Sequence, residues 1–255
     1  MQDLTLTLIQ DQIHWQQPEA NRQHFEALIS QAPSSDLILL PEMFSTGFSL
    51  QSSQLAETMT GDSIHWMTRM AKESGAVVAG SLILEDDGHY YNRLIWMRPD
   101  GTFAFYDKRH LFRMADEHHH YTPGDERLVV TLNGWRICPL VCYDLRFPVW
   151  SRNTSSFDLL LYVANWPEKR RLHWQRLLPA RAIENLCYVA GLNRVGEDGN
   201  AIAYSGDSVV ISPKGEELLN AGSDAGLFTV QLNHEELASY REKFPAHLDA
   251  DHFHF

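Results

Sequence analysis

The chain has 255 residues, of which 33 are acidic and 21 are Lys or Arg, so its formal net charge is −12. A chain of this length can bury a large hydrophobic core without disulfides or a structural metal, which excludes the small stapled scaffolds. Affinity for nucleic acid needs clustered Lys and Arg, and the acidic balance therefore excludes a nucleic-acid partner. A hydrophobic fraction of 44% also excludes the composition of disordered chains.

The cysteines and the absence of long apolar runs indicate the cellular compartment of the protein. Cys138, Cys142 and Cys187 are an odd number, and their spacing matches no zinc framework. Free thiols are typical of a reducing compartment, so we expect a cytoplasmic protein. No run reaches the length of about 18 apolar residues that a spanning helix needs, and the N-terminus lacks the basic segment of a signal or transit peptide. We therefore expect no membrane association.

The first half of the chain alternates strand and helix patterns. Leu and Thr alternate over residues 4–8, as in a half-buried strand, and a continuous apolar run over 36–41 ends at Glu42. Gly75 is a C-cap candidate for the helix before it, while Asp-Gly pairs at 87–88 and 100–101 predict hairpin turns. These patterns predict helices over 18–32 and 62–74 and strands over 4–8, 36–41, 76–84, 89–97 and 102–106.

The second half opens with residues 108–125, which have no clear period and are predicted to form an ordered, functional loop. The apolar run 135–141 leads directly into Cys142, and Pro179 is expected to kink or split a helix over 168–186. A last helix would place Leu237, Tyr240 and Phe244 together. Further strands are predicted over 135–141, 157–163, 187–193, 207–212 and 227–232.

Strands interleaved with amphipathic helices, and joined in places by hairpins, predict an α/β fold of mixed sheets in layers with helices outside. No linker, repeat or low-complexity segment interrupts the pattern. We therefore expect a single domain over residues 1–255, with 245–255 as a C-terminal tail.

Three residues could carry chemistry together. Glu42 and Cys142 both follow apolar strands, and functional side chains of α/β folds gather at strand ends. A thiol needs a base to become a nucleophile, and Glu42 could take its proton. Lys108 could balance the negative charge of Glu42 and stabilise an oxyanion.

Each of these residues also has an ordinary structural interpretation. A Cys at the end of an apolar strand is more often a small core residue, and Glu42 could cap a helix or pair at the surface. Lys108 stands in a charged stretch that could be a solvated face. Composition and spacing therefore leave the function open.

Three segments resemble the active-site segments of the nitrilase (carbon-nitrogen hydrolase) superfamily, in that chain order. They are Leu-Pro-Glu-Met-Phe at 40–44, Tyr-Asp-Lys-Arg-His-Leu-Phe at 106–112 and Leu-Val-Cys-Tyr-Asp-Leu-Arg-Phe-Pro at 140–148. Flanking segments at 121–125, 180–185 and 204–208 extend the likeness over nearly the whole chain. Further segments at 116–118, 148–153, 163–167 and 241–245 are similar to the omega-amidase branch.

The resemblance implies a four-layer αββα sandwich, a homodimer and no cofactor. It also implies roles that agree with the chemistry above: Cys142 attacks an amide carbonyl, Glu42 acts as the base, and Lys108 with the backbone N–H of Tyr143 holds the oxyanion. Glu117 would orient the substrate and the catalytic lysine. The expected product of the first step is a thioester acyl-enzyme.

For the omega-amidase branch, the resemblance implies hydrolysis of the terminal carboxamide of 2-oxoglutaramate or 2-oxosuccinamate. A small-molecule substrate of this kind carries a carboxylate, which an arginine fork binds well. We expect Arg113 to be that anchor, with Arg170 and Arg171 as reserves. Arg146 is expected to be a structural salt-bridge partner, and Tyr143 and Trp166 to line the pocket.

Two groups of alternatives remain. Glu117 and the three histidines at 118–120 resemble a metal cluster, but adjacent side chains are not expected to converge, so we predict no metal. The competing functions are a carbamoylase, nitrile-cleaving enzyme or other amidase with the same triad, a catalytically silent binding protein on the same fold, and a hydrolase that pairs its cysteine with a histidine.

Overall fold

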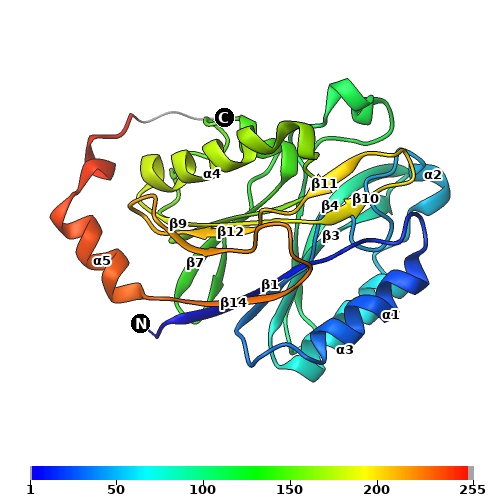
Figure 1. The fold of residues 1–255 in the computed structure, drawn as a ribbon, viewed down its shortest axis with the longest axis horizontal. Coiled ribbons are helices and arrows are strands. Elements are labelled where there is room, and N and C mark those ends of the chain that lie inside the picture. Colours follow the sequence, from blue (N-terminus) through cyan, green and yellow to red (C-terminus); the bar gives the residue numbers. More distant parts are fainter. Residues whose placement is uncertain (1, 252–255) are drawn as a thin grey trace.

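Two six-stranded sheets face each other at the centre of the protein (Figure 1), of which the computed structural model describes residues 2–251. The first sheet has the order β14 (Gly226–Leu232), β1 (Leu4–Gln10), β2 (Leu37–Leu39), β3 (Val77–Asp86), β4 (His89–Met97) and β5 (Phe103–Asp107). The second has the order β13 (Glu217–Asn220), β12 (Val209–Ile211), β9 (Tyr188–Asn193), β8 (Leu159–Ala164), β7 (Trp135–Val141) and β6 (Val130–Leu132).

Both sheets are mixed, as predicted. Strands β1, β2 and β3 are parallel to one another, and so are β7, β8 and β9. The outer strands of each sheet add antiparallel pairs, including the β3–β4 hairpin at Asp87 and Gly88, which both have positive φ. The carboxyl ends of the parallel strands therefore lie at one edge of each sheet, where side chains from the two sheets can meet.

Alternation along the strands divides the apolar side chains between two cores. Leu4, Leu6 and Leu8 of β1 lie between the two sheets, with Trp135 and Ile137 of β7 in the same cluster. Ile9 faces the other way, into the cluster under the helices. The period of two residues in a strand is thus what builds a sandwich with covered outer faces.

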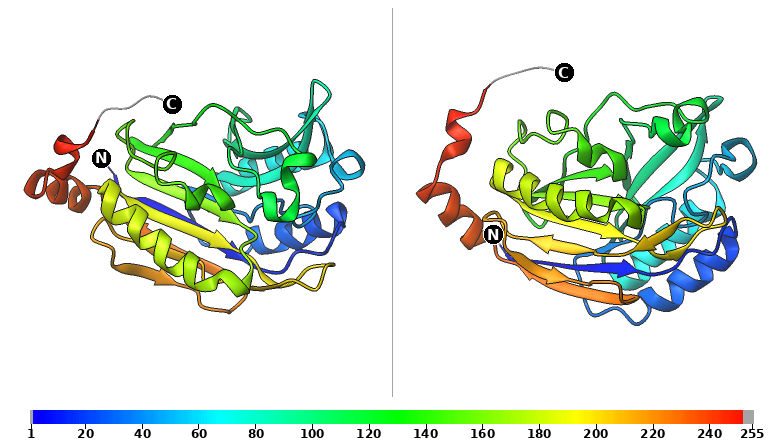
Figure 2. Two further views of the ribbon diagram at one scale, coloured as in Figure 1. Left: turned by 90° about the horizontal axis from the view of Figure 1, so that it is seen from above. Right: turned by 45° about the horizontal axis from the view of Figure 1, so that its top comes forward.

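The helices form the outer layers (Figure 2). Helices α1 (Pro18–Ile29) and α3 (Asp62–Ser74) bury Phe25 and Met67 against the first sheet. Helix α4 (Arg171–Asn185) covers the second sheet and approaches β9 so closely that a Cβ on Gly191 would lie 2.6 Å from Leu178. The predicted four-layer αββα sandwich is confirmed. The remaining helical segments are α2 (Ser52–Leu55), α5 (His234–Lys243) and the 3₁₀ helices η1 (Arg113–Ala115), η2 (Glu117–His119), η3 (Cys142–Arg146), η4 (Glu168–Arg170) and η5 (Ala246–Asp249).

Most predicted elements are present, and their ends follow the expected signals. Helix α1 begins at Pro18, and α3 ends at Gly75 in the left-handed conformation. Helix α4 continues through Pro179, which excludes the predicted split of this helix. The predicted tail begins at Pro245, and residues 252–255 of it lie outside the described residues.

The sequence did not predict four short strands. Two of them, β6 and β13, are edge strands of the second sheet. The other two, β10 (Val195–Glu197) and β11 (Ala203–Ser205), form a separate hairpin. Strands of three or four residues are too short to show a period, so only their pairing reveals them. Among residues 2–251, no helix is long and apolar enough to cross a membrane.

Candidate active site

Glu42 lies just beyond the carboxyl end of β2 and is completely buried. Its Oε1 accepts hydrogen bonds from Lys108 Nζ at 2.8 Å and Asn92 Nδ2 at 2.8 Å. Its Oε2 accepts from the backbone N–H of Asn165 at 2.7 Å, across the interface between the two sheets. Burial of a carboxyl group is costly unless it is hydrogen-bonded, and Glu42 has three donors.

Lys108 follows β5 and bridges two buried carboxylates. Its ammonium lies 2.8 Å from Glu42 Oε1 and 2.9 Å from Glu117 Oε1, and only 1% of its side chain is exposed. Burial alone would lower the pKa of Lys108, but the charges of Glu117 and Glu42 raise the pKa well above its ordinary value. The lysine is therefore a permanent cation in this site, suited to stabilise developing negative charge.

Glu117 is held by the loop that the sequence predicted to be functional. It lies in η2, is completely buried, and its Oε2 accepts the backbone N–H of Phe112. Burial raises the pKa of Glu117, and the charge of Glu42 raises it further, whereas Lys108 opposes the shift. The Glu117 carboxylate thus lies in contact with Lys108, as the resemblance implied.

Cys142 begins η3 directly after β7 and has a positive φ of 43°. A left-handed conformation is strained for a residue with a side chain and is typical of functional turns. Burial raises the pKa of the Cys142 thiol well above its ordinary value, and the negative charge of Glu42 raises it further, whereas Lys108 lowers it. At neutral pH the group is therefore a thiol beside a carboxylate, so it needs a base during the reaction.

The first turn of η3 is a source of backbone donors for a ligand. In a 3₁₀ helix the N–H groups of the first two residues have no partner within the helix, and here they belong to Cys142 and Tyr143. The N–H of Tyr143 is the donor that the resemblance implied for an oxyanion. Its place at the start of the turn gives it that capacity.

Asp144 connects the Cys142 turn to the Lys108 loop. Its carboxylate accepts the backbone N–H of Val141 at 3.1 Å, the hydroxyl of Tyr106 at 2.7 Å and the backbone N–H of His110 at 3.0 Å. Tyr106 and His110 flank Lys108 by two residues on either side. One buried side chain thus fixes the nucleophile candidate and the cation candidate relative to each other, a role that no sequence pattern indicated.

Cys142 differs from the other two cysteines in its surroundings. All three are free thiols, as predicted. Cys138 is completely buried in the larger hydrophobic cluster, where burial raises its pKa to about 12. Burial also raises the pKa of Cys187. Charged groups act on all three thiols, but of the three it is Cys142 that has a hydrogen bond with a carboxylate, Glu42, so the geometry favours this one as the reactive thiol.

A small cavity of about 60 Å³ opens onto Cys142 and Lys108. Tyr143 and Trp166 contribute to its wall, as expected for them, and so do side chains from the β10–β11 hairpin that the sequence did not predict. The cavity combines an aromatic lining with a few polar groups, which is the usual form of a small-molecule site. The aromatic wall consists of Phe48, Phe112, Tyr143, Trp166 and Tyr204.

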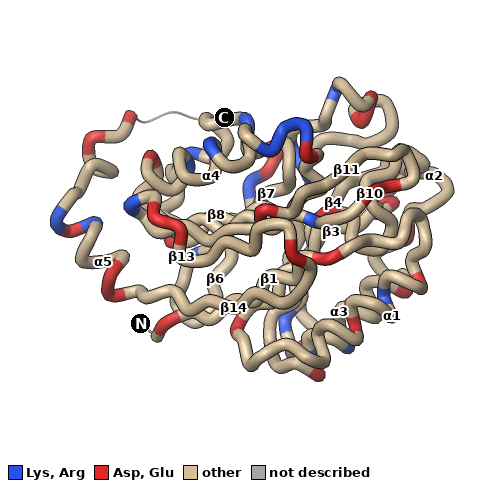
Figure 3. The backbone as a smooth tube through the Cα atoms, viewed as in Figure 1, with Lys and Arg blue, Asp and Glu red and all other residues tan. Residues whose placement is uncertain are grey.

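The arginines of the cavity are not those that we expected first. Arg113 is exposed and does not line it, and Arg171 is paired with Asp207 through bonds of 2.6 and 2.7 Å. Arg146 and Arg170 line the cavity instead. Arg113 begins η1, and its side chain is exposed to solvent. The spacing of residues along the sequence does not predict the conformation of such a loop. Figure 3 shows basic residues gathered at the start of α4, beside this region.

Arg146 is not the salt-bridge partner that we expected. Its guanidinium lies over the ring of Trp166 at 4.9 Å, and its Nη2 lies 2.8 Å from His173 Nδ1. Burial lowers the pKa of Arg170, and the positive charge of Arg146 lowers it further. In the part of the chain that the structure describes, neither guanidinium forms an ion pair with a carboxylate. The cavity therefore contains two arginines with capacity for an anion.

Asn92 and Asn165 were missed from the sequence, although both contact Glu42. Asn165 follows β8 immediately, so the strand-end argument that found Glu42 and Cys142 could have found it too. Its Nδ2 donates to the backbone oxygen of Glu42 at 2.6 Å, whereas its Oδ1 is buried and has no donor among residues 2–251. Asn92 stands inside β4, and only its polarity within a buried run could have marked it.

The chain is similar to known proteins over nearly its whole length. The carbon-nitrogen hydrolase family model matches residues 5–242. The omega-amidase YafV of Escherichia coli strain K12 is 52% identical, with 99% of each chain covered, and the 2-oxoglutaramate amidase of Bacillus subtilis is 33% identical, with 94% of this chain and 95% of the relative covered.

A solved structure is similar over the full length. It is a CN-hydrolase superfamily protein of Xanthomonas campestris with an arsenic adduct in its active site, 45% identical, with a TM-score of 0.98 and 100% of both chains covered. The match of sequence, fold and site segments agrees with the resemblance seen in the three motifs. The chain belongs to the carbon-nitrogen hydrolase family.

Proposed function

We propose that this protein is an omega-amidase that hydrolyses the terminal carboxamide of 2-oxoglutaramate or 2-oxosuccinamate to the 2-oxo dicarboxylic acid and ammonia. The observation that carries the proposal is the cavity itself, which is lined by the Cys142 thiol and by the Lys108 ammonium that bonds to Glu42. Two arginines that have no carboxylate partner among residues 2–251 also line it. The omega-amidase and 2-oxoglutaramate amidase names of the relatives support the same substrate class.

In the first half of the reaction, Glu42 takes the thiol proton as the Cys142 sulfur attacks the carboxamide carbon. The resulting oxyanion is stabilised by the ammonium of Lys108 and the backbone N–H of Tyr143. When the intermediate collapses, the proton on Glu42 passes to the nitrogen, and the carbon-nitrogen bond breaks. Ammonia leaves, and the acyl group remains as a thioester on Cys142.

In the second half, Glu42 removes a proton from water, which attacks the thioester carbon. Lys108 and the Tyr143 N–H again hold the oxyanion, and the sulfur leaves and regains a proton from Glu42. Glu117 acts by fixing the position of Lys108 and by balancing its charge. The cycle consumes one water and regenerates the thiol and the carboxylate.

Specificity for an acidic amide is assigned to Arg146 and Arg170. A planar guanidinium can bind a carboxylate through two hydrogen bonds, and two of them in a small cavity suit an anion better than one. The net charge of −12 repels anions from the surface as a whole, so a local cationic site is needed to attract one.

Asn165 supplies a second selective contact. Its buried Oδ1 is an acceptor without a donor among residues 2–251, and the residue itself lines the cavity. A carboxamide brings two N–H donors to this place, whereas an ester brings none. Burial of an unmet acceptor costs about 1–3 kcal/mol, so the amide would be preferred.

The proposal is tested by ammonia release from a panel of substrates. We expect 2-oxoglutaramate to give a kcat/KM about 10–100-fold above short uncharged amides, since a charged hydrogen-bonded anchor contributes about 1.5–3 kcal/mol. Glutamine carries the same α-carboxylate, so its turnover tests selection for the 2-oxo group and not the carboxylate anchor. Faster turnover of a nitrile, a carbamoyl compound or a neutral amide would instead support the rival enzymes of this family.

The same assay distinguishes an enzyme from a silent binding protein. Cys142→Ala should lower kcat by about 10⁴-fold or more while the fold is retained, as for nucleophiles of comparable hydrolases. Cys138→Ala is the matched control, because that thiol is buried in the core, and we expect its turnover to stay near the wild-type value. Unchanged turnover in Cys142→Ala would remove the mechanism.

Three further expectations belong to this proposal. The relatives of similar length support a single domain, and we propose that the protein acts as a homodimer in the cytoplasm. The dimer is testable by light scattering of the purified chain. A monomeric mass at the concentration of the activity assay would exclude the homodimer and would leave the proposed reaction unaffected.

A further inference from the structure

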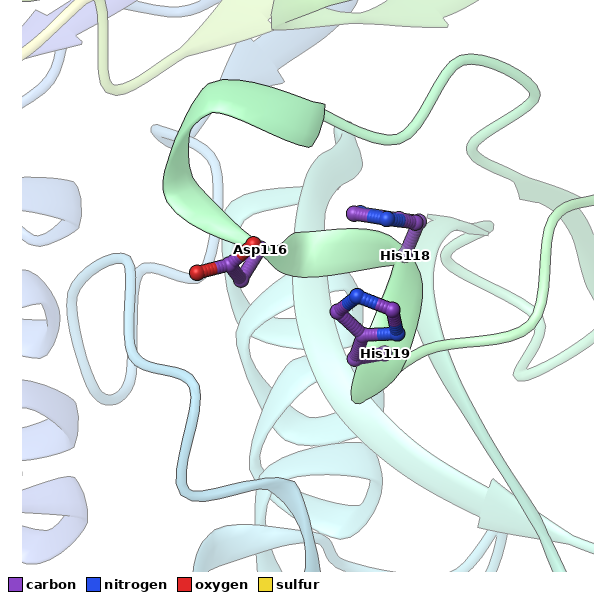
Figure 4. A group of neighbouring side chains, drawn as sticks. All are labelled: Asp116, His118 and His119. Atoms are coloured by element: carbon purple, nitrogen blue, oxygen red, sulfur yellow. The ribbon is translucent and has the colours of Figure 1, made fainter.

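Outside the cavity, Asp116, His118 and His119 form a cluster on the loop that carries Glu117. Each side chain offers one ligand atom, and these atoms all lie within 4.8 Å of one another. Figure 4 shows the two imidazole rings beside each other and Asp116 at the start of the same turn. Their ring centroids are 3.9 Å apart. The expectation that adjacent histidines would not converge is therefore wrong for this pair.

The backbone explains the convergence. Asp116 has a left-handed φ of 59°, and the N–H of His119 bonds to the carbonyl oxygen of Asp116 at 3.0 Å, which closes a tight turn. His120 lies just beyond the turn and is not part of the cluster. A turn fixed by its own hydrogen bonds presents the three side chains without help from a ligand.

The three side chains are also uncommitted. The Nδ1 atom of His118 is buried and has no hydrogen-bond partner within the residues that the structure describes. Over the same range, neither Asp116 nor His119 takes part in an ion pair. A buried imidazole nitrogen without a partner is unusual, because such groups are normally satisfied.

We propose that Asp116, His118 and His119 bind a divalent first-row transition ion such as Zn²⁺ or Ni²⁺. Two imidazoles and a carboxylate are ligands that these ions prefer, whereas Mg²⁺ and Ca²⁺ require mainly oxygen ligands. Bonds of about 2.0–2.2 Å place ligand atoms about 3–3.5 Å apart, so side-chain rotations must close the present spacing by about 1.5 Å. Asp116 and His119 are exposed and free to make that adjustment.

The site lies on the outer side of the turn whose inner side holds Glu117. Glu117 stands between two of the ligands in sequence, and its carboxylate contacts Lys108 at 2.9 Å. An ion bound outside would therefore hold in place the turn that positions Glu117. The proposal does not depend on the substrate or the mechanism, because it rests only on this cluster.

One feature opposes the ion and can be used to test the site. Arg113 lies on the preceding turn, and its positive charge acts on His118. Since Arg113 does not line the cavity, its removal should leave the active site intact. Arg113→Ala is therefore expected to tighten metal binding several-fold.

The test is calorimetric titration of tag-free, full-length protein with NiCl₂ and with ZnCl₂. All proteins carry Cys142→Ala, so that the active-site thiol contributes no ligand. We expect one site per chain, and a His118→Ala/His119→Ala variant to bind at least about tenfold more weakly, since even groups behind the ligands change affinity by 10–100-fold. His120→Ala is the matched control from the same histidine run and should bind as the parent does.

No saturable binding by the parent, or an equal loss in the His120→Ala control, would overturn the site. A His247→Ala/His252→Ala/His254→Ala variant should keep the binding; loss there would assign the ion to the C-terminal histidines instead. If the double variant does not fold, diethylpyrocarbonate labelling of the wild-type protein decides. Zn²⁺ should protect His118 and His119 but not His120, and labelling that Zn²⁺ leaves unchanged would end the proposal.

Discussion

The cavity has two sets of basic residues, Lys108 and the pair Arg146 and Arg170, and they differ in how their positive charge is compensated. At its inner end, Lys108 is almost completely buried and compensated by two carboxylates at 2.8 and 2.9 Å. In its wall, Arg146 and Arg170 are only half-buried and rest against aromatic rings. The charge of Lys108 is compensated by carboxylates within the folded protein. Among residues 2–251, Arg146 and Arg170 have no carboxylate partner, so donors of their guanidinium groups can still bind an anion.

This difference separates reaction from recognition. Buried charges in fixed hydrogen bonds need no rearrangement when a transition state forms, which is what electrostatic catalysis requires. Unpaired guanidiniums are not useful for stability, but they contribute binding energy when an anion arrives. Under the proposed function, the compensated cluster carries out the chemistry and the uncompensated pair selects the substrate.

The largest expected effect comes from breaking the compensated cluster. Lys108→Met leaves Glu42 and Glu117 buried without a counter-ion, so we expect the free energy of unfolding to fall by about 3–5 kcal/mol. Loss of the oxyanion contact should lower kcat by about 10²–10³-fold. Urea unfolding and ammonia release measure the two effects. Lys72→Met, at an exposed position of α3, is the control and should change neither. Wild-type stability in Lys108→Met would contradict the buried cluster.

A smaller and more selective effect is expected for the arginine pair. Arg146→Gln and Arg170→Gln should each raise KM for 2-oxoglutaramate by about 10–100-fold, the value of one charged hydrogen bond, with little change for a short uncharged amide. Arg171→Gln is the matched control, because that guanidinium is already paired with Asp207. Equal losses on the charged and uncharged amides would remove the carboxylate anchor.

The mildest perturbation is a change of pH. Because burial and Glu42 raise the pKa of the Cys142 thiol, the thiolate fraction at neutral pH is small and increases about tenfold with each pH unit below that pKa. Iodoacetamide labelling should therefore be slow at pH 5 and accelerate steadily toward pH 9. Glu42→Gln removes a negative charge, which should lower the pKa and speed labelling at every pH. Rapid labelling at pH 5 would instead indicate a thiolate paired with a histidine.

The sequence was sufficient where a short-range pattern determines the structure. Glu42 and Cys142 were found because each ends a buried strand, and Gly75 because a helix needs a left-handed cap there. The partners of Glu42 were not found, since Asn92 lies 50 residues away and Asn165 lies 123 residues away. Such contacts depend on how the two sheets pack, and spacing along the chain carries no sign of it.

The arginines show the same limit in a loop. Arg113 was favoured because it lies between Lys108 and Glu117 in sequence, but the 3₁₀ turn directs it to the surface. Arg146 was set aside as structural, although η3 turns it into the cavity. Proximity in sequence does not determine side-chain direction when the backbone reverses within three residues.

The hydrogen bond from Asn165 to Glu42 joins the two halves of the sandwich at the candidate active site. Glu42 and Lys108 follow strands of one sheet, and Cys142 and Asn165 follow strands of the other. Neither half alone contains all four of these residues. We therefore expect hydrolytic activity to appear during refolding only after the two halves have docked, so that its appearance reports the docking.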